Sequence, residues 1–160
     1  MENTVKIVLT IIALTLAGCS VTKTAQPGDE FGLDHAITER MRDALLGRWC
    51  GEKIYSDGTV QRWTVLRLRD GAYKVDFYTI DADGKEERWG EYGLWGVRAP
   101  IYFTAMRGFI KEARAREADT TNALFYDAYK VVELNEEVFT YKSYTSGNTF
   151  TLTRECGEGI

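Results

Sequence analysis

From residue 48 onward the hydrophobic pattern changes to that of β-strands, with alternating positions in some runs and apolar residues on both faces in others, such as residues 61–66. The alternation is clearest in residues 73–77 (YKVDF), and turn-forming segments such as 81–84 (DADG) separate successive runs. Such turns favour antiparallel hairpins between neighbouring runs. Eight runs rich in β-branched and aromatic residues follow from this pattern, at 48–55, 60–69, 72–80, 85–95, 101–109, 124–133, 138–145 and 149–154. The sequence therefore predicts an all-β fold, an eight-stranded antiparallel up-and-down barrel that closes around a core or one small ligand.

Two segments of the folded part depart from this alternation. Apolar residues recur at helical spacing from Ile37 to Leu45, with Asp34 available as an N-cap and Gly47 as a stop, so a short helix is expected before the barrel. Segment 111–121 (KEARAREADTT) carries charges nearly all round and predicts a solvated helical turn or loop. The alternative is a mobile lid, or a loop that contacts a partner, over one mouth of the barrel.

The first 18 residues have the layout of a secretory signal peptide. The apolar stretch 7–16 (IVLTIIALTL) is well short of the ~20 residues that a spanning helix needs. It leads into residues 16–19 (LAGC), which resemble the lipobox of bacterial lipoproteins. The resemblance implies that Cys19 is lipidated with diacylglycerol and acyl chains such as palmitate, and that residues 1–18 are removed. The alternative is an ordinary signal peptide in which the cysteine is incidental.

Lipidation at Cys19 would hold the chain at a membrane leaflet without spanning the membrane. Residues 19–32 are small and polar with no periodicity, so they predict a flexible tether, and the folded barrel domain is expected over 33–160. Ser20, rather than an Asp, follows the cysteine. By the sorting rules of such lipoproteins, this implies a lipid-anchored location in the bacterial cell envelope, on the periplasmic face of the outer membrane.

Composition narrows the possible functions. The 160 residues are 44% hydrophobic and 12% aromatic, which suits one folded domain. A net charge of −4 without any run of basic residues argues against nucleic acid as a partner. The single His, His35, precedes the barrel, and no metal-ligand spacing or phosphate-binding glycine loop is present. We therefore expect no enzymatic activity, no catalytic residues, no metal and no cofactor.

Two cysteines remain once Cys19 is assigned to lipid. In an exported protein, Cys50 and Cys156 predict a disulfide, although two unpaired buried thiols are the alternative. The bridge requires the first and last strands to lie close together, as they do in a closed barrel. If Trp49 points inward then Cys50 points outward, so the chain must leave strand register after Arg154 to bring Cys156 to it.

Residues 47–49 (GRW) open the first strand after a short helix, and Arg154 ends the last strand. This arrangement resembles the first signature of the lipocalins, which other calycins share loosely. In lipocalins the Trp lies at the closed end of the barrel and an Arg of the last strand packs across its ring. The resemblance implies a lipocalin-like barrel in which Trp49 and Arg154 form a structural pair at the floor.

The remaining expectation concerns the barrel interior, where large apolar side chains either fill the core or line a ligand pocket. The candidate ligand-binding residues are Lys53, Trp63, Tyr73, Val75, Phe77, Trp89, Phe103 and Tyr126. The leading hypothesis is a membrane-anchored envelope lipoprotein that binds or carries a small hydrophobic or lipidic ligand. The alternative is a non-enzymatic structural or assembly lipoprotein with a filled barrel that contacts another envelope protein.

Overall fold

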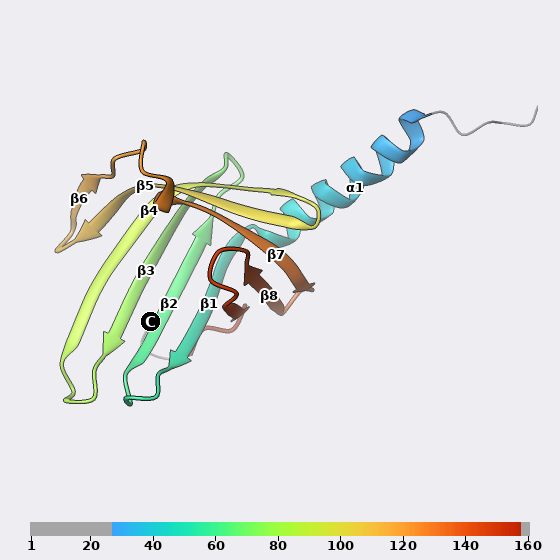
Figure 1. Ribbon diagram of the computed structural model, residues 1–160. Coiled ribbons are helices and arrows are strands. Elements are labelled where there is room, and N and C mark those ends of the chain that lie inside the picture. Colours follow the sequence, from blue (N-terminus) through green and yellow to red (C-terminus); the bar gives the residue numbers. More distant parts are fainter. Residues whose placement is uncertain (1–26, 158–160) are drawn as a thin grey trace, which may run out of the picture.

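The computed structural model describes residues 27–157, and their side chains from residue 34 onward (Figure 1). The predicted signal peptide, Cys19 and most of the predicted tether lie outside the described residues. Helix α1 spans Pro27–Leu45 and leads directly into the barrel. It begins before the predicted start at Asp34, whose carboxylate pairs with Arg98 on the barrel instead of capping the helix.

Nine antiparallel strands follow the helix. Their bounds are β1 (Gly47–Ile54), β2 (Val60–Arg67), β3 (Ala72–Ile80), β4 (Glu86–Arg98), β5 (Ile101–Lys111), β6 (Arg114–Glu117), β7 (Tyr126–Leu134), β8 (Val138–Ser143) and β9 (Thr149–Thr153), and a 3₁₀ turn, η1 (Ala123–Phe125), precedes β7. Sequential neighbours pair from β1 to β5, then β5 pairs with β7, and β9 returns to β1. This closes a ring of eight strands, so the predicted eight-stranded up-and-down barrel with a preceding helix is confirmed.

The ninth strand, β6, corrects the prediction for segment 111–121. The segment forms no helical turn; it is a hairpin in which β6 pairs with the end of β5, opposite residues 108–111. Glu112 and Ala113 make the turn with positive φ angles of 53° and 61°. A turn of this kind usually carries Gly or Asn, and because neither residue is present the turn could not be predicted. Figure 1 shows the hairpin projecting from one end of the barrel.

The core is concentrated where helix α1 meets the barrel. Leu45, Trp49, Phe139 and Leu152 are fully buried there, on α1, β1, β8 and β9 respectively. The helix thus contributes its last turn to the same apolar cluster as the first and last strands. Burial of this kind stabilises by about 1.5–3 kcal/mol for each large side chain. The cluster closes one end of the barrel and leaves the other half of the interior for the site described below.

Candidate functional site

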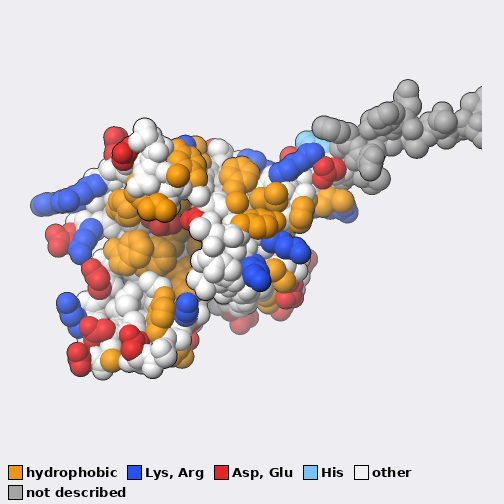
Figure 2. Space-filling view, in the orientation of Figure 1, with side chains coloured by type: hydrophobic (Ala, Val, Ile, Leu, Met, Phe, Trp, Pro, Cys, Tyr) orange, Lys and Arg blue, Asp and Glu red, His pale blue; other side chains and the backbone are white. Residues whose placement is uncertain are grey.

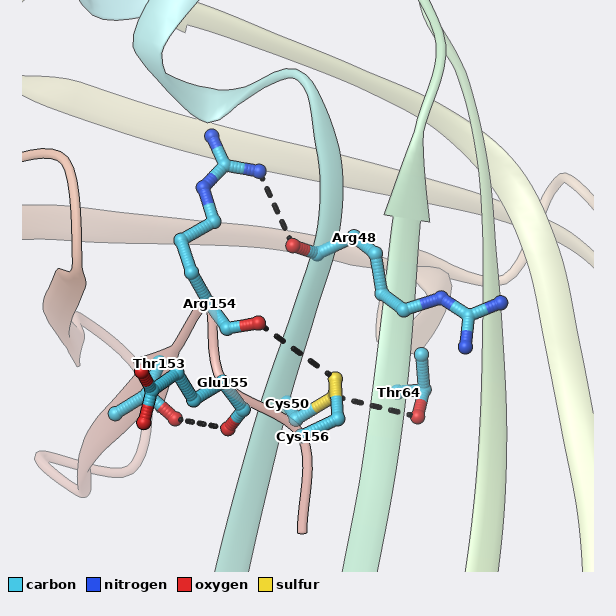
Figure 3. Close-up of a disulfide and its surroundings, with 7 residues drawn as sticks. All are labelled: Arg48, Cys50, Thr64, Thr153, Arg154, Glu155 and Cys156. Carbon is cyan, nitrogen blue, oxygen red and sulfur yellow. Dashed lines mark hydrogen bonds between the residues drawn. A yellow bond between two sulfur atoms is a disulfide. The ribbon is translucent and has the colours of Figure 1, made fainter. Parts of the chain in front are cut away.

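The closed end is sealed by Arg154, as Figure 3 shows in part. Its guanidinium carbon lies 3.9 Å from the centroid of the Trp49 ring. Nη1 donates hydrogen bonds to the carbonyls of Leu46 (2.6 Å) and Arg48 (3.1 Å), and Nη2 donates to the carbonyl of Ala44 (2.7 Å). These carbonyls belong to the end of α1 and the start of β1, where the helix leaves acceptors unpaired. Arg154 therefore ties the last strand, the first strand and the helix together.

A disulfide joins Cys50 on β1 to Cys156, 106 residues later in the chain (Figure 3). The two Cα atoms are 5.4 Å apart, a normal separation for this bond. Cys50 lies on the outer face of the barrel beside the hydroxyl of Thr64, and Cys156 reaches it because β9 ends at Thr153. The bridge closes the seam between the first and last strands from outside.

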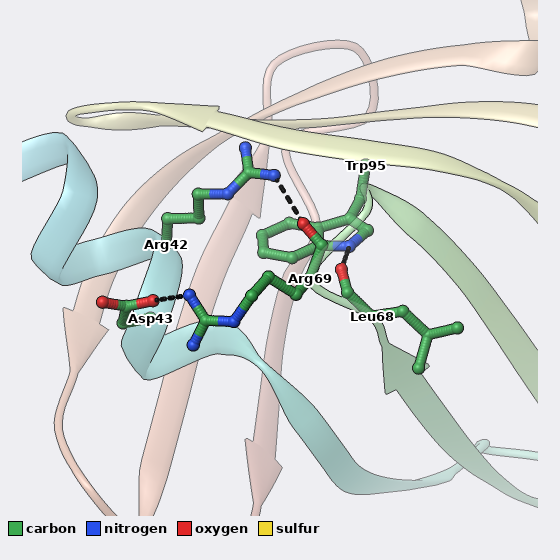
Figure 4. Close-up of polar contacts among 5 residues, drawn as sticks. All are labelled: Arg42, Asp43, Leu68, Arg69 and Trp95. Carbon is green, nitrogen blue, oxygen red and sulfur yellow. Dashed lines mark hydrogen bonds and ion pairs between the residues drawn. The ribbon is translucent and has the colours of Figure 1, made fainter.

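The end of α1 is also fastened to the turn between β2 and β3, as Figure 4 shows. Arg42 donates from Nη2 to the carbonyl of Arg69 (2.9 Å), and Arg69 pairs through Nη1 with Asp43 (2.9 Å). The Arg42 guanidinium lies 5.6 Å from the ring centroid of Trp95, whose indole N–H donates to the carbonyl of Leu68. The helix is therefore held across this end of the barrel from two sides.

Above this floor, the barrel encloses a cavity of about 250 Å³. Its wall combines aromatic and aliphatic side chains with four charged side chains. The lining residues are Lys53, Tyr55, Gln61, Trp63, Val65, Arg67, Tyr73, Val75, Phe77, Glu91, Tyr102, Thr104, Asp127, Tyr129, Tyr141 and Phe150. Figure 2 shows hydrophobic side chains gathered in a hollow over β3 and β4 on the face it presents. Of the eight predicted ligand-binding residues, the structure brings Lys53, Trp63, Tyr73, Val75 and Phe77 together in this wall.

The other three predicted residues do not line the cavity. Trp89 stacks on Phe77, with ring centroids 4.1 Å apart, and borders an outer depression of about 630 Å³ whose remaining wall carries exposed charged side chains. Phe103 is 44% exposed on the outer face, where its ring covers Gly96. Tyr126 is also exposed, and its hydroxyl contacts neighbouring polar groups. In both β5 and β7 the neighbouring positions face inward, so these two side chains point outward.

One arginine in the cavity wall was not among the predicted site residues. Arg67, at the end of β2, is only 1% exposed. Its Nε and Nη2 donate to the hydroxyl of Tyr102 at 3.2 and 3.1 Å, and its guanidinium lies over the rings of Tyr102 and Phe139. Nη1 is buried without a hydrogen-bond partner. Arg67 faces the interior together with Trp63 and Val65, because the three are alternate residues of β2. Since β2 has apolar residues on both faces, its sequence alone did not show which face is the inner one.

Two carboxylates complete the polar part of the wall, Glu91 on β4 and Asp127 on β7. Burial raises the pKa of Glu91, and the nearby charge of Asp127 raises it further, against the opposing hydrogen bond from the Tyr73 hydroxyl (3.3 Å). The Asp127 carboxylate has no hydrogen-bond partner among the described residues. Burial also raises the pKa of Tyr73 and Tyr102, so both phenols stay protonated and can donate hydrogen bonds.

The side chains that line the cavity include hydrogen-bond donors, hydrogen-bond acceptors and aromatic rings. Within residues 34–157, no group of three His, Cys, Asp or Glu side chains is placed to hold a metal ion. The cavity instead offers phenol and guanidinium donors, carboxylate acceptors and flat aromatic walls, which is the composition of small-molecule sites. Over the same described range, no helix is both long and apolar enough to cross a membrane.

No protein-family model matches this chain, and no curated protein sequence does. Among solved structures, a lipocalin-like protein from Bacteroides uniformis is similar to it. The two are 15% identical over 70% of this chain and 99% of that chain, with a TM-score of 0.43. The functional interpretation therefore rests on the geometry of this barrel, with its closed floor, its Arg154 and Trp49 pair, and its polar cavity.

Proposed function

We propose that this protein is a lipoprotein of the bacterial cell envelope that binds or carries a small ligand inside its barrel. The observation that carries the proposal is the cavity of about 250 Å³ above a sealed floor. A barrel with a purely structural role would be expected to fill this space with side chains. The alternative of a filled assembly lipoprotein is therefore less well supported than ligand binding.

The size of the cavity restricts the ligand. An engineered apolar cavity of about 150 Å³ binds benzene, so 250 Å³ accommodates roughly ten non-hydrogen atoms. A molecule with a long acyl chain would leave most of that chain outside. Because charged and aromatic groups share the wall, the ligand is expected to be a compact amphipathic molecule rather than a whole lipid.

Native mass spectrometry of the full-length protein, exported to a bacterial periplasm, tests the proposal. A mass excess that disappears on denaturation is expected. Val75→Phe should abolish it by filling the cavity, whereas Val132→Phe is a matched control because Val132 is 58% exposed outside the barrel. An empty wild-type protein, or equal occupancy in both variants, would refute ligand binding in the cavity.

The membrane anchor is a separate part of the proposal and is supported by the lipobox at residues 16–19. Labelled palmitate supplied to expressing cells should be incorporated into the wild-type protein and not into Cys19→Ala. The wild type should also fractionate with the outer membrane. Equal labelling of the two proteins would show that Cys19 is not the lipidated residue.

A further inference from the structure

The inner end of the cavity holds donors that nothing in the described structure satisfies. Arg67 Nη1 is buried without a partner, and no described carboxylate lies within ion-pair distance of this guanidinium. The Tyr102 hydroxyl accepts from Arg67, and its own hydrogen has no acceptor among the described residues. A buried charge without a counter-charge is costly, and native proteins rarely retain one without a reason. Together, these donors fit a carboxylate.

Two carboxylates that form no ion pair with a described residue lie nearer the mouth. Glu91 pairs across the sheet with Val75, and Val75 pairs with Val65, which is two residues from Arg67. Inward positions two residues apart are about 7 Å apart along a strand. The Glu91 carboxylate thus belongs to the next layer of side chains above the Arg67 layer.

Asp127 occupies the corresponding layer on the other side of the cavity. It pairs with Thr104, which is two residues from Tyr102 on β5. The negative charge of Asp127 raises the pKa of Glu91, so the two carboxylates lie close to the same part of the cavity. Two carboxylates facing one space favour a cation between them.

We infer that the cavity takes a small zwitterion, an amino carboxylate with its two charged groups separated by a short apolar body. The carboxylate binds Arg67 and Tyr102, and the ammonium group binds Glu91 and Asp127. Trp63 and its aromatic neighbours pack against the body between them. This inference rests on the proposed ligand-binding function and specifies the chemical class of its ligand.

Charge balance supports a zwitterion over a ligand of one sign. With the tyrosines protonated, the charged groups of the wall are Lys53, Arg67, Glu91 and Asp127, whose charges sum to zero. A simple anion would satisfy the arginine and leave the carboxylates facing each other. A simple cation would leave Arg67 unpaired. Only a ligand that carries an anionic and a cationic group pairs with Arg67 and with the two carboxylates, and it keeps the cavity neutral.

Isothermal titration calorimetry with four matched probes tests the inference on the full-length oxidised protein. The four probes share one benzene ring. Para-aminomethylbenzoate carries both charges, para-toluate only the negative charge, para-methylbenzylamine only the positive charge, and para-xylene neither. The zwitterion should bind at least about tenfold more tightly than the other three. If another probe binds equally or more tightly, the zwitterion inference is wrong and ligand binding stands. If none binds and native mass spectrometry finds the protein empty, the proposed function itself fails.

Variants separate the two ends of the site. Arg67→Met should weaken zwitterion and toluate binding by about tenfold to a hundredfold and leave methylbenzylamine binding nearly unchanged. Glu91→Gln should weaken methylbenzylamine and leave toluate unaffected. Tyr102→Phe should act like Arg67→Met, while Tyr141→Phe is its matched control because that hydroxyl lines the cavity without bonding to Arg67.

The selectivity of these effects distinguishes a binding role from a structural one. A variant that merely loosens the barrel would weaken all four probes alike, and this result for both Arg67→Met and Tyr102→Phe would overturn the assignment. Methionine is close in length to the aliphatic part of arginine and removes the buried charge, so Arg67→Met is expected to fold. Should it fail to fold, Tyr102→Phe carries the same measurement, since its ring remains.

Discussion

Arg154 and Arg67 each lie over an aromatic ring, and they differ in burial and in hydrogen bonding. At the floor, Arg154 is only partly buried, yet its guanidinium donates to three backbone carbonyls. In the cavity, Arg67 is 1% exposed, yet its Nη1 has no partner. The more buried group is therefore the one whose hydrogen bonding is incomplete.

The contrast between the two arginines separates the part of the barrel that stabilises the fold from the part that is available to a ligand. A floor whose arginine donates to three backbone carbonyls stabilises the fold without needing a further molecule. A cavity that retains an unpaired donor and carboxylates without a counter-charge lowers stability until something binds there. Proteins tolerate such local costs mainly at functional sites. The floor and the cavity should therefore respond in opposite ways to removal of their polar groups.

Removal of the disulfide on the outer face of the barrel should reduce stability more than any other change considered. Replacing Cys50 and Cys156 by Ala should lower the free energy of unfolding by about 4 kcal/mol, because the bridge closes a loop of 106 residues in the unfolded chain. Denaturant titration of oxidised wild type and the double variant measures it. Ligand affinity should stay unchanged, since neither cysteine lines the cavity. A loss below about 1 kcal/mol would contradict the expectation.

The next effect tests the two arginines directly. Arg154→Met should lower the free energy of unfolding by about 3 kcal/mol, since it removes the stacking on Trp49 and leaves three carbonyls without their donor. Arg67→Met should leave stability unchanged or raise it, because it removes an unpaired buried charge. The same substitution at both sites makes each the control of the other. Equal losses would mean that Arg67 is as structural as Arg154.

The strands were predictable because local signals and tertiary structure agree. Turns with positive-φ glycines, such as Gly71 and Gly84, separate alternating runs, and the hairpins form between them. The Cys50–Cys156 disulfide was predictable because these two cysteines remain once Cys19 is assigned to lipid in a chain expected to be exported, and the closed barrel brings them together. Strand β6 was not, because Glu112 and Ala113 adopt positive φ without the residues that normally announce such a turn.

The site was predicted only in part, for a different physical reason. A charged residue in a half-buried strand points outward by default, so Arg67, Glu91 and Asp127 gave no sign of facing inward. Large aromatics were expected inside, yet Phe103 covers the bare backbone of Gly96 on the outside. Once the register of the strands is known, the alternation of inward and outward positions places the charged residues and Phe103 correctly. The pattern within a single strand does not determine that register.

A smaller effect is expected where a ring of the cavity wall packs against bare backbone. A Cβ added at Gly51 would overlap the ring of Trp63, which lies across this position. Gly51→Ala should therefore cost about 1–3 kcal/mol of stability and weaken ligand binding, because the ring must shift within the cavity. Gly157→Ala is a suitable control, since an added Cβ there meets nothing. Thermal unfolding and calorimetry measure the two effects, and a Gly51→Ala protein with wild-type stability would show that Trp63 is free to move.

The smallest expected effect is a pH dependence of stability that arises in the cavity and not at the floor. Because burial raises the native pKa of Glu91 above its ordinary value, the folded protein holds this proton more tightly than the unfolded chain does. The stability gained from protonation is complete below the ordinary value of about 4.3 and is lost as the pH rises through the native pKa. Glu91→Gln should therefore give a small rise in Tm near pH 7 that vanishes near pH 4.

Glu136→Gln, at an exposed turn, should change Tm at neither pH and serves as the control. A rise that persists at low pH would mean that Glu91 destabilises through its shape rather than its charge. With para-aminomethylbenzoate bound, the ligand's ammonium should stabilise the ionised carboxylate and reduce or reverse the benefit of Glu91→Gln near pH 7. The floor offers no such reversal, because the partners of Arg154 are backbone carbonyls, which do not titrate.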